Sequence, residues 1–148
     1  MAEASAPSAA KTPVWFYIIG VVAVLWNAMG AVDYVMTQFR VEAYMASFSE
    51  EQLAYFYGFP AWFVAVWATA VWSALAASLL LLFRSKLAAP IFLLSLAGFV
   101  INTIYTFAFT PALEIMGAGN VVFSGVIFAS LVFLWWFSRF SETRGWLR

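Results

Sequence analysis

The sequence predicts an all-α integral membrane protein, in which four spans form a helix bundle and a short interfacial helix lies in the first outer loop. The chain of 148 residues is 66% hydrophobic and only 9% charged, whereas a soluble domain carries about 25% charged residues. Its uncharged runs are long enough to cross a hydrocarbon core of roughly 30 Å at about 1.5 Å per residue. Lysine and arginine also gather on one side of these runs, as the positive-inside rule requires.

Composition also limits the function. The chain contains no cysteine and no histidine, which removes disulfides, thiolate and imidazole ligands, and the commonest general base. The formal net charge is zero, so no basic patch is available for nucleic acid. We therefore expect a protein that is not an enzyme, that holds no metal or cofactor, and whose first partner is the lipid bilayer.

The first span is expected over residues 14–36, after an Ala-, Ser- and Pro-rich segment at 1–13 that should form a flexible cytoplasmic tail. Small and polar residues recur in this span at spacings of three and four, at Gly20, Ala23, Asn27, Gly30 and Tyr34. This spacing predicts one small, polar face on an otherwise apolar helix.

The first outer loop contains a helix-start signal. Ser49 is followed three residues later by Gln52, which is the spacing of a capping box. The pattern predicts a short helix from Glu50 to about Tyr57, ended by Gly58. Its aromatic residues favour a position at the membrane interface or over the opening of the bundle.

The second span, residues 60–83, is an uncharged run that begins at Pro60 and ends before Arg84. Small side chains follow one another every four residues, at Ala61, Ala65, Thr69, Ser73 and Ala77. Because small residues let membrane helices approach closely, we expect this stripe to pack against another helix. The alternative is that it lines a cavity.

The third span is expected at 89–110 and the fourth at 120–140, with a basic cytoplasmic tail at 141–148. One face of the third span is small and polar, with Ser95, Gly98, Asn102 and Thr106. In the fourth span, Gly125 and Ala129 have the small-xxx-small spacing of a membrane helix contact. Both patterns predict faces that turn toward other helices.

Cationic residues give the topology. With both termini on one side of the membrane, six of the seven cations share that side and only Arg40 lies opposite. The six are Lys11, Arg84, Lys86, Arg139, Arg144 and Arg148. The positive-inside rule then makes both termini cytoplasmic.

Depth along the spans selects candidate ligand-binding residues. Counted from the expected helix starts, Asn27 and Asn102 lie at similar depths in the outer half, with Thr69 close by. Trp26 and Tyr105 offer aromatic faces nearby. A mouth above them would be formed by Asp33, Tyr34, Arg40 and Glu114. The alternative is a structural hydrogen bond between the two asparagines, and we expect Asp33 to pair with Arg40 or solvent rather than to relay protons.

Three stretches carry a family resemblance: Leu25–Gln38, Ser47–Ala68 and Ala89–Phe107. They resemble small bacterial four-span membrane proteins that are often labelled "sugar transporter", over roughly residues 14–140. The resemblance implies a multi-pass protein of the bacterial inner membrane and an oligomeric carrier for a small neutral solute such as a sugar. The alternative is a non-catalytic accessory subunit of a larger membrane complex; an enzyme acting on lipid or quinone lacks the side chains it would need.

Overall fold

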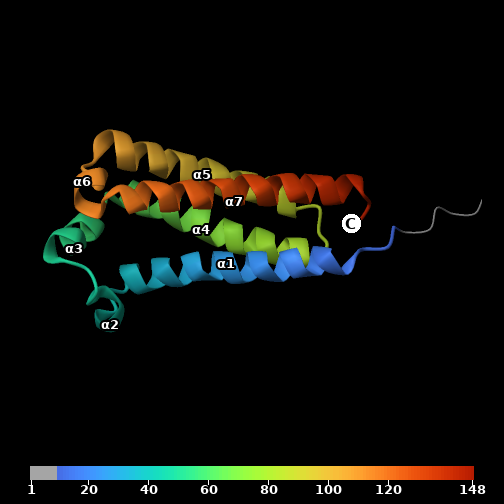
Figure 1. The fold of residues 1–148 in the computed structure, drawn as a ribbon, viewed down its shortest axis with the longest axis horizontal. Helices are drawn as coiled ribbons and strands as arrows, with labels where there is room; N and C mark the ends of the chain where they lie inside the picture. The colour runs from blue at the N-terminus through green and yellow to red at the C-terminus, as the bar shows by residue number, and fades with distance from the viewer. Residues whose placement is uncertain (1–9) are drawn as a thin grey trace, which may run out of the picture.

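The computed structural model describes residues 10–148, which are all-helical. Four long helices run up and down as a bundle (Figure 1): α1 (Val14–Gln38), α4 (Ala61–Leu82), α5 (Ala88–Phe109) and α7 (Ala118–Thr143). Each is long and apolar enough to cross a membrane. The expected spans are confirmed with shifts of at most three residues, the largest at the end of α7.

Three short helices gather at one end of the bundle (Figure 1): α2 (Glu42–Met45), α3 (Glu50–Tyr57) and α6 (Ala112–Met116). Helix α3 was expected from its capping box, whereas α6 lies between the third and fourth expected spans, where no helix was predicted. We call this the helical-loop end. The opposite end, where α1 begins and α7 finishes, is the terminal end.

Helices α4 and α5 make the closest contact. A Cβ atom added to Gly98 would lie 3.2 Å from the Cβ of Ala70, and Ser95 Oγ donates to the Ala70 carbonyl at 2.6 Å. The expected small, polar face of α5 therefore does face the bundle. Glycine favours this contact, because a Cβ atom at that position would crowd Ala70 and push the two helices slightly apart.

The stripe predicted on α4 does not pack as a unit, and that prediction is wrong. Ala61, Ala65 and Thr69 are exposed on the outer surface and Ser73 is half-buried, while Ala77 alone is fully buried. An α-helix has about 3.6 residues per turn, so each step of four residues turns about 40° too far and four steps wind about 160° around the helix. The stripe therefore begins on the surface and ends in the core.

The predicted small-xxx-small contact of α7 is also not made within this chain. Gly125 and Ala129 are both exposed, and a Cβ added to Gly125 would meet nothing within 4 Å. The first buried residue of α7 is Leu131. Only the half of α7 nearer the terminal end is packed into the bundle.

The terminal end contains the core. Phe16, Phe92, Phe137 and Leu81 are almost completely buried there. The Phe16 and Phe137 rings lie with centroids 5.8 Å apart. Large side chains from all four spans thus fill this half of the bundle.

The last residues fold back onto this core, so the prediction of a basic tail at 141–148 is wrong. Helix α7 continues to Thr143, and Gly145 adopts a positive φ of 72°. The Trp146 N–H donates to the Ser141 carbonyl at 3.0 Å, in the pattern of a Schellman cap. Trp146 and Leu147 are then buried against the bundle.

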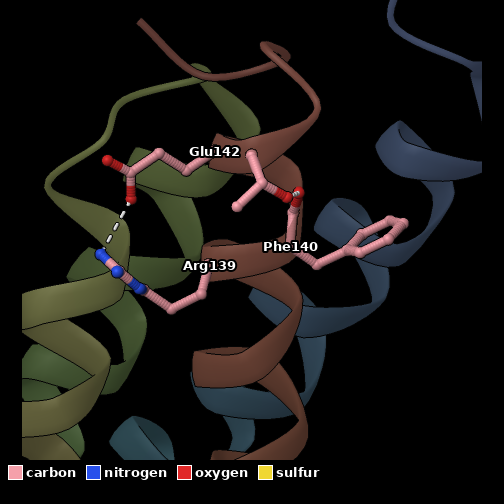
Figure 2. Close-up of polar contacts among 4 residues, drawn as sticks. Arg139, Phe140 and Glu142 are labelled. Carbon is pink, nitrogen blue, oxygen red and sulfur yellow. Dashed lines mark hydrogen bonds and ion pairs between the residues drawn. The ribbon is translucent and has the colours of Figure 1, made fainter.

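Backbone contacts fasten the returning segment to the loop between α4 and α5. Arg148 N donates to the Arg84 carbonyl at 2.7 Å, and Lys86 N donates to the Arg148 carbonyl at 3.1 Å. Arg84 Nε also donates to the Trp146 carbonyl at 2.7 Å. One turn earlier, Arg139 and Glu142 form an exposed ion pair at 3.2 Å (Figure 2). Of the expected tail at 1–13, residues 1–9 lie outside the described residues.

Candidate functional site

Helix α3 forms a roof over the helical-loop end, and its capping box is confirmed. Gln52 N donates to Ser49 Oγ at 3.2 Å, and Ser49 N donates to Gln52 Oε1 at 3.1 Å. The Gln52 amide also reaches the Ile115 carbonyl of α6 at 3.3 Å. The Tyr55 hydroxyl lies 2.8 Å from Thr110 Oγ1, just beyond α5. These contacts hold α3 across the ends of the spans.

A cavity of about 480 Å³ lies beneath this roof, between the four spans. Its wall is largely aromatic and aliphatic, with Trp67, Phe99 and Phe123 among its residues. Polar side chains are spaced along it, including Asn27, Asn102 and Asp33. The cavity ends toward the core at Ala74 and Leu131 and reaches α2, α3 and α6 at its other end.

Asn27 lies at the deep end of the cavity. Its amide nitrogen donates to Ser78 Oγ of α4 at 2.8 Å and to the Ala23 carbonyl at 3.0 Å. Ser78, which is fully buried, donates in turn to the Ala74 carbonyl at 2.8 Å. The carbonyl oxygen of Asn27 accepts no hydrogen bond from the described residues and is left at the cavity wall.

Asn102 lies near the roof and repeats this arrangement. Its amide nitrogen donates to the Phe63 carbonyl of α4 at 3.3 Å. Its Oδ1 atom is buried and has no hydrogen-bond partner among the described residues. Both asparagines thus donate through the amide nitrogen within the protein, and the buried Oδ1 of Asn102 is an acceptor that costs free energy until it is satisfied.

The two asparagines do not face each other, so the expected contact between them is wrong. Asn27 bonds to Ser78, whereas Asn102 bonds to Phe63. Because Gly20 lies beside Leu82 and Gly98 beside Ala70, the antiparallel helices place Asn27 level with about Leu75 of α4 and Asn102 level with about Val66, roughly 14 Å apart along the helix. Helix α1 is shifted toward the terminal end: its Gly20, seven residues before Asn27, already lies beside Leu82 at the end of α4. The cavity joins both levels and is therefore elongated.

Of the other three predicted ligand residues, one lines the cavity and two do not. Trp26 lines the cavity, and its Nε1 atom donates to Ser130 Oγ of α7 at 3.2 Å. Thr69 does not line the cavity, because it lies on the exposed face of α4 and bonds to the carbonyl of its own helix at Ala65. Tyr105 packs against Trp62, with ring centroids 4.9 Å apart, and also lies outside the cavity wall.

Of the four predicted mouth residues, only Asp33 lines the cavity. It accepts a hydrogen bond from the Tyr44 hydroxyl and does not pair with Arg40, so of the two partners expected for it, Arg40 or solvent, Arg40 is wrong. The Arg40 guanidinium instead lies 4.1 Å from the centre of the Tyr57 ring. Tyr34 packs on Trp67, and Glu114 is exposed on α6.

Two tyrosines at the helical-loop end have raised pKa values. The hydrogen bond to Asp33 raises the pKa of Tyr44 from 10.0 to about 12, with burial and the carboxylate charge adding to it. Burial raises the pKa of Tyr55, although its hydrogen bond with Thr110 acts in the opposite direction. Both phenols are therefore neutral at physiological pH, and Tyr44 remains a donor to Asp33.

Sequence reasoning missed three residues that hold the site together: Tyr44, Ser78 and Ser130. Ser78 and Ser130 are hydroxyls inside apolar runs, and polar groups inside a membrane span generally find partners. The position of these two hydroxyls inside apolar runs could therefore have indicated that each bonds to a partner. It could not say which partner each would find, because the partners lie 51 and 104 positions away in the chain.

No protein-family model, no curated protein and no solved structure matches this chain. Its class follows from its own fold. Four apolar helices of spanning length, with exposed aliphatic and aromatic side chains along them, define a small multi-pass membrane protein in contact with the lipid bilayer. Within that class, the chain is a four-helix bundle that holds an elongated, mostly apolar cavity in one half.

Proposed function

We propose that this protein binds a small uncharged molecule in its cavity, as the loading step of a carrier. The main observation in favour of this proposal is the cavity. Its volume of about 480 Å³ falls within the roughly 300–1,000 Å³ of small-molecule sites. An apolar wall with a few fixed polar groups is also the usual composition of such sites.

The residues that line the cavity favour an uncharged ligand with an apolar body. Among the residues that the structure describes, no lysine or arginine lines the cavity, so an anion would find no cationic partner there, and the one lining carboxylate, Asp33, is already bonded to Tyr44. The unpaired oxygens of Asn27 and Asn102 call for hydroxyl or N–H donors on the ligand. A free sugar has more hydroxyls than this wall has partners, so a sugar with an apolar substituent fits better.

The bundle is filled by large side chains in one half and holds a cavity in the other, and this difference supports a carrier. Phe16, Phe92 and Phe137 close the terminal end, while the cavity occupies the other half. A carrier alternates between states open to opposite sides. In the second state, the backbone contacts of Arg84 and Lys86 with the segment Trp146–Arg148 would have to separate.

Charge supports an orientation for this carrier. Arg84, Lys86 and Arg148 lie at the terminal end, and Arg40 lies at the other. We propose that the terminal end is cytoplasmic, in the inner membrane of a bacterium, because translocated loops carry few cations. No catalytic step belongs to this proposal.

Binding of a radiolabelled alkyl glycoside, compared with the free sugar, tests the proposal. In proteoliposomes, the native protein should bind the alkyl glycoside saturably and more tightly. Asn102→Leu should weaken binding by about tenfold, the effect of losing one hydrogen bond worth about 1.4 kcal/mol. Thr69→Val, on the lipid-facing surface, is the matched control and should bind normally. If the native protein bound no neutral amphiphile or sugar in such a panel, the proposal would fail.

A second function, that of an accessory subunit, is supported by the exposed small residues. Ala61, Ala65 and Thr69 on α4, and Gly125 and Ala129 on α7, would let helices of another chain approach closely. Native mass spectrometry of the protein taken from its own membrane tests this. A foreign subunit in fixed ratio that is lost with Ala65→Leu would favour the accessory role; a homo-oligomer lost with the same change would favour an oligomeric carrier.

A further inference from the structure

The bundle is open along one seam. Helix α1 packs along α4, α4 along α5, and α5 along α7, but the backbones of α1 and α7 make almost no close approach. Side chains alone bridge these two helices. At the terminal end the Phe16 and Phe137 rings touch, and further along Trp26 reaches Ser130.

Beyond the contacts of Trp26 with Ser130 and Phe123, toward the helical-loop end, no hydrogen bond or ring contact joins the described residues of α1 and α7. No residue of α7 before Leu131 is buried. On α1, a Cβ added to Gly30 would meet nothing within 4 Å, and the same holds for Gly119 and Gly125 on α7. The outer half of α7 therefore stands away from α1.

The cavity reaches the molecular surface along this seam. Met29 of α1 and Phe123 of α7 both line the cavity, yet they are 66% and 56% exposed. Every other cavity-lining residue of the four spans is buried or half-buried, and these two lie on opposite sides of the seam. Because this part of the surface belongs to apolar spans, the opening leads into hydrocarbon and not into water.

We propose that the ligand is an uncharged membrane amphiphile, a single hydrocarbon chain with a hydroxyl-bearing head, which enters sideways from the bilayer between α1 and α7. This inference rests on the proposed function and names its ligand class and route. Along α4 the cavity-lining residues run from Phe63 to Ala74, roughly 16 Å at about 1.5 Å per residue, and the cavity continues to α2, α3 and α6. Its volume of about 480 Å³ then gives a mean cross-section of no more than about 30 Å², which suits one extended chain.

Charge at the helical-loop end selects the head group. Acidic side chains outnumber the single cation there: Asp33, Glu42, Glu50, Glu51 and Glu114 against Arg40. A phosphate head group would be repelled at this rim. A neutral hydroxylated head meets no such penalty, and it supplies the donor that Asn102 Oδ1 lacks.

Trp26 closes the part of the seam that lies nearer the terminal end. Its indole N–H reaches Ser130 Oγ at 3.2 Å, and its ring lies 6.4 Å from that of Phe123. The side chain thus crosses from α1 to α7 beside the opening. Loosening this contact by Trp26→Phe, which keeps an aromatic ring but removes the donor, should speed entry of the ligand.

Photolabelling in proteoliposomes tests the route. The probe is a long-chain alcohol with a diazirine in its chain, and labelled peptides are identified by mass spectrometry. The chain has no native cysteine, so paired cysteines can be crosslinked without interference. Met29→Cys with Phe123→Cys closes the seam, and Tyr44→Cys with Met116→Cys closes the helical-loop end. Each double variant is compared with itself before crosslinking.

The native protein should be labelled on inward-facing residues such as Ala74 and Phe99, and excess unlabelled alcohol should suppress the labelling. Crosslinking the seam should reduce this labelling by an order of magnitude, and crosslinking the helical-loop end should leave it unchanged. Trp26→Phe should raise the labelling rate several-fold, whereas Trp72→Phe, on the exposed face of α4, should not. Labelling that survives seam closure would overturn the sideways route but leave binding intact. Absence of saturable interior labelling in the native protein would overturn binding as well.

Discussion

Asn27 and Asn102 each join two helices through the amide nitrogen and leave the amide oxygen free. Asn27 is the more deeply placed, and it bridges α1 and α4 through Ser78. A hydrogen bond between membrane helices is worth about 0.6–2 kcal/mol. This side chain should therefore contribute to stability independently of any ligand.

Replacing Asn27 with Leu tests that contribution. The variant loses the bonds to Ser78 and to the Ala23 carbonyl, and we expect a destabilisation of about 1–2 kcal/mol. Thermal unfolding in detergent, measured without ligand, gives the value. Thr69→Val serves as control, since its hydroxyl bonds only to its own helix on the exposed surface. Equal stability of the two variants would contradict a structural role for Asn27.

Tyr44 gives a pH dependence with a definite sign. Its pKa is raised from 10.0 to about 12 because the phenol donates to Asp33. The folded state thus favours the neutral phenol, and its stabilising effect is complete below pH 10 and lost as the pH rises through about 12. Ultraviolet titration of tyrosinate should show one late-titrating phenol that is missing in Tyr44→Phe. Asp33→Asn should return this titration toward 10.0; an unchanged titration would rule out the Asp33 contact as its cause.

Among the elements, α3 depends most on local sequence. Its capping box satisfies two backbone N–H donors, those of Ser49 and Gln52, and its side chains bond to α6 and to Thr110. Because no residue of α3 is fully buried, the cap and these few bonds carry much of its order.

Ser49→Ala should weaken α3 by about 1 kcal/mol, the usual effect of losing a side-chain cap. Amide hydrogen exchange over Glu50–Tyr57 should become faster, while α4 stays protected. Ser47→Ala is the matched control, because Ser47 lies in the same loop and bonds only to the Tyr44 carbonyl. Unchanged exchange in Ser49→Ala would show that tertiary contacts alone order the helix.

For the whole molecule, the orientation in the membrane is the outstanding expectation. The absence of native cysteine allows single-cysteine labelling in intact cells with a membrane-impermeant thiol reagent. Glu51→Cys, exposed at the helical-loop end, should be labelled, and Leu87→Cys, exposed at the terminal end, should react only after the membrane is opened. The reverse pattern would place the terminal end outside and contradict the charge argument.

The sequence by itself determined the number of spans, their bounds to within three residues, and the capped helix α3. These features depend on hydrophobic length and on groups only a few residues apart. The inward faces of α1 and α5 could likewise be read from their periodicity, because Gly20, Ala23, Asn27, Ser95 and Gly98 are all buried.

Only the tertiary structure decided how those helices are staggered and rotated. Stagger separates Asn27 from Asn102 by roughly 14 Å along the bundle, although their positions in their own spans are similar. Rotation places Ala65 and Thr69 on the surface and Ala70 and Ala74 inside. Both depend on packing between residues far apart in the chain, such as Gly98 against Ala70 and Gly20 against Leu82. The fold-back of Trp146, the bond from Trp26 to Ser130 and the open seam beside it have the same origin: contacts that no local pattern encodes.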